Sequence, residues 1–133
     1  MDSVIKDFRD LEVWKRYKVL RSEMWALCKS FPLEEKYRLS DQIIRASRSV
    51  TACIAEGYGR FHHQENIQFC RQSRGSLYEL IDHVDVAFDS EYIDEKKKSE
   101  LIDMIVLCIR ILNGYIRHLK KQKELNKKSL PTK

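Results

Sequence analysis

The sequence predicts an all-α fold, an antiparallel up-down-up-down four-helix bundle. Apolar residues recur at alternating steps of three and four in four long segments, which is the spacing of one helix face. The connections between these segments are short, and the 133 residues include only four Gly and two Pro. No segment alternates apolar and polar residues as a strand does. Short connections place successive helices side by side and antiparallel.

The first predicted helix runs from about Asp10 to Ser30 and ends before Pro32, which disfavours helix at the residue preceding it. Its apolar seam consists of Val13, Tyr17, Leu20, Met24, Leu27 and Phe31. Trp14 and Trp25 are eleven residues apart, so they lie within about 20° of each other around the helix. A small bundle could not cover all of this surface, and we therefore expect part of this helix to lie between subunits.

The second predicted helix is capped by Ser40 and contains the slim apolar segment from Ile43 to Arg60. Its small residues should permit close approach of a neighbouring helix, so that Leu at position 52 would overpack the bundle. These small residues include Ala46, Ser49 and Ala52. Gly57 and Gly59 are expected to end the helix in the left-handed conformation.

The third predicted helix runs from about His63 to Asp89, and the fourth follows its cap Asp94 and fades near Glu124. The seam of the third consists of Ile67, Cys70, Arg74, Leu77, Ile81, Val84 and Phe88. The seam of the fourth consists of Leu101, Ile105, Cys108, Leu112, Tyr115 and Leu119. A buried Arg74 needs a partner, and matching heights across the bundle suggest Glu23. Residues 1–125 form the predicted bundle domain, and residues 126–133 a Lys-rich tail that we expect to be disordered.

The cysteines and the apolar runs indicate a reducing, aqueous environment. The four Cys, at positions 28, 53, 70 and 108, are widely separated and form no CxxC pair, so they are interpreted as reduced core residues. No apolar run is long enough for a membrane span, and the first ten residues lack a signal-peptide core. We expect a cytoplasmic protein that makes no membrane contact.

The sequence predicts no catalytic residue, no metal site and no cofactor. It lacks the paired Glu-x-x-His motifs of carboxylate-bridged di-iron bundles. His62 and His63 have no partner carboxylate for acid–base work at a phosphate. Glu56 is expected to form a salt bridge with a guanidinium, that of Arg60, Arg71 or Arg117, and not to act as a general base. The expected protein is not an enzyme.

Four motifs carry a resemblance to a known family. They are FRDLEVW at Phe8–Trp14, IAEGYGR at Ile54–Arg60, RGSLYEL at Arg74–Leu80 and ILNGYIRHL at Ile111–Leu119. In these motifs the chain resembles the 23S ribosomal RNA intervening-sequence proteins, also called four-helix bundle proteins or S23 ribosomal proteins. The match extends from Phe8 to Lys120.

The resemblance implies a short bundle that assembles into a homopentamer and is often encoded within an insertion in a ribosomal RNA gene. The chain is also similar to the accessory variability determinant of diversity-generating retroelements, a basic pentamer that binds nucleic acid. Two departures stand out. Thr51-Ala52-Cys53 replaces the usual Pro-Ser-Asn, which predicts an unkinked second helix, and His62-His63 replaces the usual Ser or Thr cap of the third.

Charge is strongly segregated along the chain. Residues 36–74 carry a net charge of +4 and residues 104–133 of +7, whereas residues 75–103 carry −6. In an up-down bundle the first two segments share one end, which is therefore basic. The cations predicted to bind nucleic acid there are Arg48, Arg60, Arg71, Arg117, Lys120, Lys121 and Lys123, beside His62 and His63, with Lys127, Lys128 and Lys133 in the tail. Such a surface suits a phosphate backbone.

Two functions follow from this pattern. In the first, the protein oligomerises and binds nucleic acid, most plausibly structured RNA, through its basic end, because repetition of a weak patch makes binding multivalent. In the second, it is a homo-oligomeric scaffold whose partner is another protein and whose contact with nucleic acid is incidental. Retention on RNA that weakens steeply with salt distinguishes the first from the second.

Overall fold

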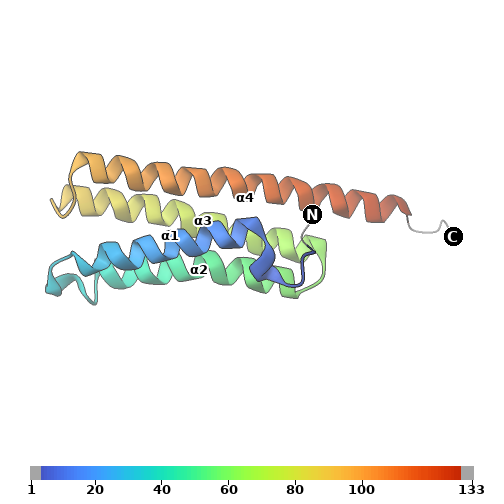
Figure 1. Cartoon of the computed structure of the whole chain (residues 1–133), viewed down its shortest axis with the longest axis horizontal. Coiled ribbons are helices and arrows are strands. Elements are labelled where there is room, and N and C mark those ends of the chain that lie inside the picture. Colours follow the sequence, from blue (N-terminus) through green and yellow to red (C-terminus); the bar gives the residue numbers. More distant parts are fainter. Residues whose placement is uncertain (1–3, 130–133) are drawn as a thin grey trace.

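The computed structural model describes residues 4–129 and confirms the predicted all-α fold. Its four helices are α1 (Glu12–Lys29), α2 (Leu39–Gly59), α3 (His63–Asp89) and α4 (Glu95–Ser129). Two short 3₁₀ turns, η1 (Phe8–Asp10) and η2 (Leu33–Glu35), precede α1 and α2. The helices run up, down, up and down, and α4 extends beyond the α2–α3 connection (Figure 1).

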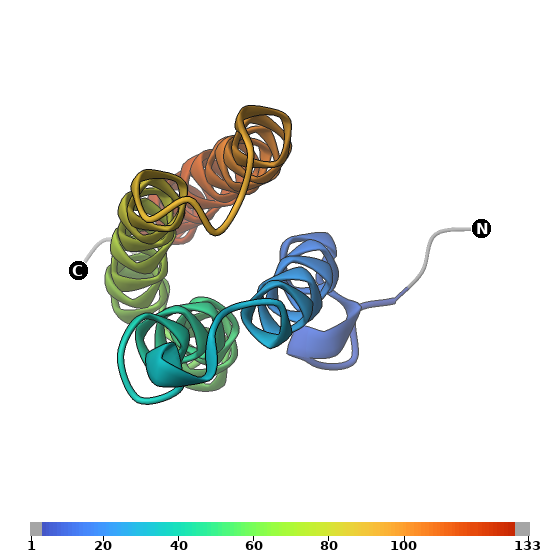
Figure 2. The ribbon, with the colours of Figure 1, turned by 90° about the vertical axis from the view of Figure 1, so that its left-hand side faces the viewer.

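The four helices form an arc and not a closed square. Seen end-on, α1 and α4 stand at the two ends of the arc, with α2 and α3 between them (Figure 2). The α2–α3 and α3–α4 contacts are the most extensive, while α1 and α4 touch over a much smaller area. Tyr17 still links the ends of the arc, because its buried hydroxyl donates to the carbonyl of Cys108 at 2.7 Å.

The core follows the first predicted seam closely, since the five seam residues within α1 and Phe31 just after it are all buried. In α3 the buried set is wider than predicted and includes Ser73, Leu80, His83 and Ala87. The reason is topological: α3 packs against both α2 and α4, so two faces of this helix are covered. Ser73 meets α2 directly, since its hydroxyl donates to the carbonyl of Val50 at 2.8 Å.

The predicted role of the glycines in ending α2 is wrong. None of the four glycines has a positive φ, and the left-handed residue after α2 is Phe61, with φ of 53°. Gly57 serves packing instead. A Cβ atom at Gly57 would lie 2.6 Å from Oδ1 of Asn66 and 2.9 Å from Cβ of Phe69, so α2 and α3 approach each other closely here because Gly57 has no side chain.

The helix caps differ from the prediction at the start of α2 and at the start of α3. Ser40 does not cap α2, which begins at Leu39 with Arg38 as its N-cap, two residues before the predicted cap; Ser40 is buried in the first turn. Asp94 caps α4 as predicted, its carboxylate accepting from the N–H of Lys97 at 2.8 Å. His62 supplies a cap for α3 after all, with Nδ1 accepting from the N–H of Glu65 at 3.4 Å.

Two side-chain positions also correct the prediction. Arg74 does not pair with Glu23, because it faces α4 and donates to Oδ1 of Asn113 at 2.8 Å, whereas α1 and α3 are not neighbours in the described part of the chain. Ala52 is exposed, so it does not line a helix contact; the small residue that does is Ala46, which is buried. The two alanines are six residues apart, so their side chains leave α2 in directions about 120° apart.

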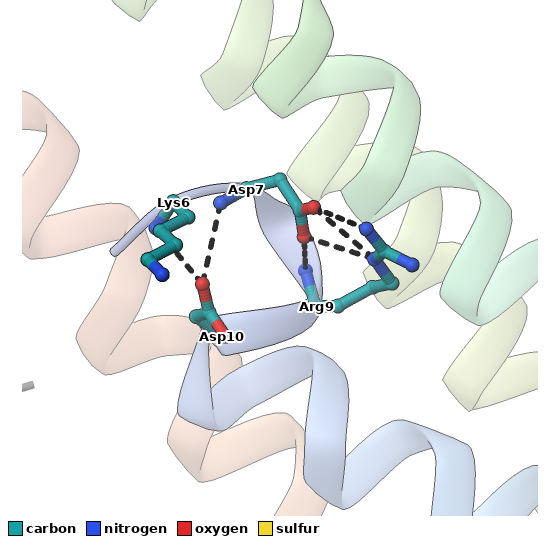
Figure 3. Close-up of polar contacts among 4 residues, drawn as sticks. All are labelled: Lys6, Asp7, Arg9 and Asp10. Carbon is teal, nitrogen blue, oxygen red and sulfur yellow. Dashed lines mark hydrogen bonds and ion pairs between the residues drawn. The ribbon is translucent and has the colours of Figure 1, made fainter. Parts of the chain in front are cut away.

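A compact turn holds the chain ahead of α1 (Figure 3). The Asp7 carboxylate accepts from the N–H of Arg9 at 2.8 Å and pairs with its guanidinium at 2.6 Å. The Asp10 carboxylate accepts in turn from the N–H groups of Lys6 at 2.8 Å and Asp7 at 3.4 Å. This reciprocal capping box fixes η1 and the direction in which the chain enters α1.

The fourth helix is longer than predicted. It continues to Ser129 and not to about Glu124, so the first part of the predicted disordered tail is helical. Its last turns contact the start of α3, where Nζ of Lys123 donates to Oε1 of Gln64 at 2.6 Å and Asn126 meets Nδ1 of His63 at 3.3 Å. Residues 130–133 of the predicted tail lie outside the described residues.

Candidate nucleic-acid interface

The α2–α3 connection and the C-terminal half of α4 bring most of the predicted cations to one end of the bundle. Two contacts fix this arrangement: Lys123 with Gln64, described above, and Asn66 with the hydroxyl of Tyr115 at 3.3 Å. We call this end the basic pole. Its predicted members are Arg60, Arg71, Arg117, Lys120, Lys121 and Lys123.

Four of these cations have neither a hydrogen-bond partner nor a salt-bridge partner among the described residues. Arg71, Arg117, Lys120 and Lys121 are exposed, and none of them forms a salt bridge within the described part of the chain. Four unneutralised cations of this kind are available for an anion from outside the chain.

The other two members are already engaged. The Arg60 guanidinium lies 5.2 Å from the centre of the Phe69 ring and 3.2 Å from the carboxylate of Glu56. The predicted Glu56–Arg60 salt bridge is thus confirmed. It is exposed on both sides and so contributes little to stability. Lys123 donates to the neutral Gln64 and keeps its charge unpaired.

Arg48 does not belong to the basic pole. It lies near the middle of α2, twelve residues before Arg60, which corresponds to about 18 Å along a helix. Its guanidinium lies 6.0 Å from the ring centre of Trp25 on α1. The prediction grouped it with the pole because the charge of a whole segment was counted, and that count ignores height along the helix.

The opposite end of the bundle, at the α3–α4 connection, is acidic. Lys98 is neutralised there by Asp85 at 2.9 Å and lies 4.3 Å from the Phe88 ring centre. The exposed carboxylates around it belong to Asp82, Asp89, Glu91, Asp94 and Glu95. Charge is therefore separated in space as well as along the sequence.

Phe61 is a member of this surface that the sequence analysis missed. It is an exposed aromatic residue in the α2–α3 connection, 87% accessible, and its ring lies 6.0 Å from that of Tyr58. Its positive φ is uncommon outside glycine. The sequence feature that could have identified Phe61 is an aromatic residue directly after Arg60 in a basic loop.

The two tryptophans predicted to lie at a subunit interface are in different surroundings. Trp14 is half-buried, because the Phe8 ring of η1 packs edge-on against it at 5.3 Å. Trp25 is 47% exposed and has the side chain of Lys29 5.5 Å from its ring centre. The chain itself thus covers part of Trp14, whereas Trp25 remains open to a ligand or partner. The interface role of both stays a prediction.

An apolar groove lies where the arc is open, between α1 and α4. Its volume is about 720 Å³, and its charged rim contains acids and bases in equal number, Glu12, Lys15, Arg16 and Asp103. Its apolar wall consists of Val19, Met104, Leu107, Cys108 and Ile111. Val19 is 58% exposed and Leu107 44%. Neither residue belongs to a predicted seam. Apolar residues outside the seams were the sequence feature that could have predicted this groove.

Three of the cysteines are held as neutral thiols, and the described residues contain no cluster that could bind a metal. Burial raises the pKa of the Cys28 thiol to about 11, of Cys70 to about 12 and of Cys108 to about 11, so these thiols are neutral at pH 7. No group of three or more His, Cys, Asp or Glu residues among residues 4–129 is arranged to hold a metal ion. No described helix has an apolar stretch that could cross a lipid bilayer.

Comparison with known proteins connects this bundle to one family. The profile of the 23S rRNA-intervening sequence proteins matches residues 9–114. The fold is similar to the 1.70 Å crystal structure of a protein of unknown function from the S23 ribosomal protein family of Bacteroides thetaiotaomicron VPI-5482. That similarity has a TM-score of 0.73 at 19% identity and covers 79% of this chain and 95% of the other. A search of curated proteins found no match.

Proposed function

The chain belongs to the 23S rRNA-intervening sequence protein family, and on this basis we propose that it is a non-enzymatic, self-associating bundle that binds nucleic acid, structured RNA in particular. The observation that carries the proposal is the set of four exposed, unpaired cations at the basic pole, Arg71, Arg117, Lys120 and Lys121. The family name refers to ribosomal RNA, which agrees with this choice of ligand. The four free thiols suit a reducing compartment, and we assign the protein to the cytoplasm.

The physical basis is release of counterions. Each phosphate that a Lys or Arg neutralises frees a condensed counterion, which favours binding without reading the bases. Within residues 4–129 no carboxylate forms a salt bridge with any of these four cations, so none competes with a phosphate for them. A strand or helix of RNA that approaches the molecule is attracted to the basic pole.

Self-association is supported by the groove between α1 and α4. Val19 and Leu107 expose apolar surface there that a further subunit could cover. The rim is electrically balanced, so two copies can meet without a net repulsion. We propose that copies associate through this groove, five being the number that the family resemblance implies. A ring would repeat the basic pole around an axis and convert weak single contacts into multivalent binding.

The test compares two pairs of adjacent lysines in the same helix. Lys120→Glu with Lys121→Glu reverses two charges at the basic pole, and Lys96→Glu with Lys97→Glu makes the same change at the acidic end. The first pair should weaken binding of unrelated RNAs to a similar degree, measured by fluorescence anisotropy at low salt, and the second should leave it nearly unchanged. Lys98 is left out of the control because it pairs with Asp85.

Other outcomes count against the proposal. Equal weakening by both pairs would mean that only net charge matters and that no localised site exists. If neither the wild type nor the variants bind RNA, the result would favour the alternative function, a scaffold that binds another protein. Circular dichroism of each variant establishes that the helices are intact.

A further inference from the structure

A second surface, far from the basic pole, combines exposed aromatic rings with unpaired cations. It is a hollow of about 480 Å³ between the end of α1, the connection through η2 and the first half of α2. Trp25 and Tyr37 line it, and Leu33 and Ile44 extend its apolar wall. Tyr37 is 83% exposed and Leu33 84%. The elements that form it lie at the end of the bundle opposite the α2–α3 connection, the end where the α3–α4 connection also lies (Figure 1).

Three cations surround these rings. Nζ of Lys29 lies 5.5 Å from the centre of the Trp25 ring, and Nζ of Lys36 lies 5.4 Å from that of Tyr37. Arg48 reaches the Trp25 ring from α2 at 6.0 Å. None of the three forms a salt bridge within residues 4–129. Weak contacts with aromatic faces are therefore the interactions that hold them near the hollow.

The hollow also has a net positive charge. Asp41 is the acidic residue among its lining residues, and it is already paired with Arg45 at 2.9 Å. Three cations of the lining therefore stand against one neutralised carboxylate, while Glu34 and Glu35 of η2 lie beside the hollow without lining it. An anionic ligand with a flat ring fits both features of the surface, because the ring can stack on an aromatic face while the anion meets the cations.

We propose that this hollow takes one unpaired nucleotide of a single-stranded nucleic acid, with its base stacked on Trp25 and its phosphates beside Lys29, Lys36 and Arg48. Stacking platforms flanked by cations are the usual way in which proteins hold single strands without reading their sequence. The volume of the hollow suits one nucleotide and not a duplex. The cations that cover the Trp25 ring move to the phosphates when a base takes their place.

The inference rests on the proposed binding of nucleic acid and adds a preference to it. The basic pole reads charge alone and accepts duplex and single strand alike, whereas the hollow accepts only an unstacked base. Arg48 and Arg60 are twelve residues apart on α2, about 18 Å along the helix. One RNA with a paired segment and a loop could therefore contact both surfaces.

The test uses the fluorescence of Trp25. The chain has two Trp, so Trp14→Phe leaves Trp25 as the single reporter. An oligouridine of about ten nucleotides should quench this fluorescence, and a duplex RNA of the same length should quench it much less. Trp25→Leu should weaken oligouridine binding roughly tenfold and leave duplex binding unchanged. Tyr78→Leu, which removes an exposed aromatic residue of α3, is the matched control and should change neither.

Arg48→Gln provides a second, less disruptive variant, and it should weaken oligouridine binding without affecting the duplex. Equal quenching by both RNAs, or oligouridine binding that survives Trp25→Leu and Arg48→Gln, would overturn the inference while the basic pole stands. A change of oligomeric state in Trp25→Leu with unchanged oligouridine binding would assign the hollow to a contact between copies and also overturn it. The variant with Lys120→Glu and Lys121→Glu tests the basic pole separately, because it should lose duplex binding.

Discussion

At the scale of single residues, the absence of one side chain governs the contact between α2 and α3. Gly57 lies where the backbones come close, and any Cβ atom there would meet the Cβ of Phe69 at 2.9 Å. The side chain of Asn66 could turn away, but the Cβ of Phe69 moves only with its backbone. The two neighbouring glycines at the end of α2 thus differ in their roles, since a Cβ atom at Gly59 would meet nothing within 4 Å.

Gly57→Ala should lower the free energy of unfolding by about 1 to 3 kcal/mol, because the added methyl group overpacks this contact. Gly75→Ala is the matched control: it also lies inside a helix but has nothing within 4 Å of the added atom. It should raise stability by about 0.5 to 1 kcal/mol through helix propensity. Urea unfolding of both variants checks this, and equal effects at the two sites would refute it.

The buried thiols make the free energy of unfolding depend on pH in the alkaline range. Burial raises the pKa of Cys70 in the folded protein to about 12, whereas the unfolded chain loses this proton near pH 8.5. Above that pH the folded state holds more protons than the unfolded state, so stability is complete below it and falls as pH rises.

Cys70→Ala should therefore reduce the loss of stability between pH 8 and pH 10 by about 1 to 2 kcal/mol. Urea midpoints at the two pH values for both proteins measure this difference. The poorer packing of Ala at position 70 costs the same free energy at both pH values and cancels in the comparison. Parallel decreases in the wild type and the variant would show that this thiol does not titrate with unfolding.

At the scale of helices, the apolar periodicity predicted well where helices lie in the sequence, but it predicted poorly which helices pack against each other. The bounds of α3 and the seam of α1 follow directly from apolar spacing, because an apolar face is buried regardless of which neighbouring helix covers it. The partner of Arg74 depended on which helix lies beside α3, and spacing carries no such information. Asn113, its observed partner, is polar and uncharged, so a search for opposite charge passed over it.

The small residues of α2 give a direct test of the corrected orientation. Ala46→Leu should destabilise the bundle by about 1 to 3 kcal/mol, because Ala46 is buried and the larger side chain overpacks its contact. Ala52→Leu adds the same atoms at an exposed position of the same helix and should change stability little. Thermal melting of the two variants measures this difference. A larger effect at Ala52 would mean that α2 is rotated from the orientation described.

At the scale of the whole molecule, the sequence predicted the fold and the separation of charge but not the open arc. Counting charge by segment located the basic pole correctly for Arg71 and Arg117, since up-down topology alone fixes which helix ends meet. The same count misplaced Arg48, which lies beside Trp25. The groove between α1 and α4 depends on how far the arc closes, a property of side-chain volumes in all four helices that no single periodic pattern records.

The central claim is that the basic pole contacts phosphates, and the salt dependence of binding tests it most directly. For RNA bound by the wild type between about 50 and 200 mM salt, the logarithm of the binding constant should fall linearly with the logarithm of salt concentration. Replacing Lys120 and Lys121 by Gln should make that slope shallower by about 1 for each phosphate that the pole no longer neutralises. Replacing Lys96 and Lys97 by Gln should leave the slope unchanged. A slope equal in all three proteins would contradict the claim.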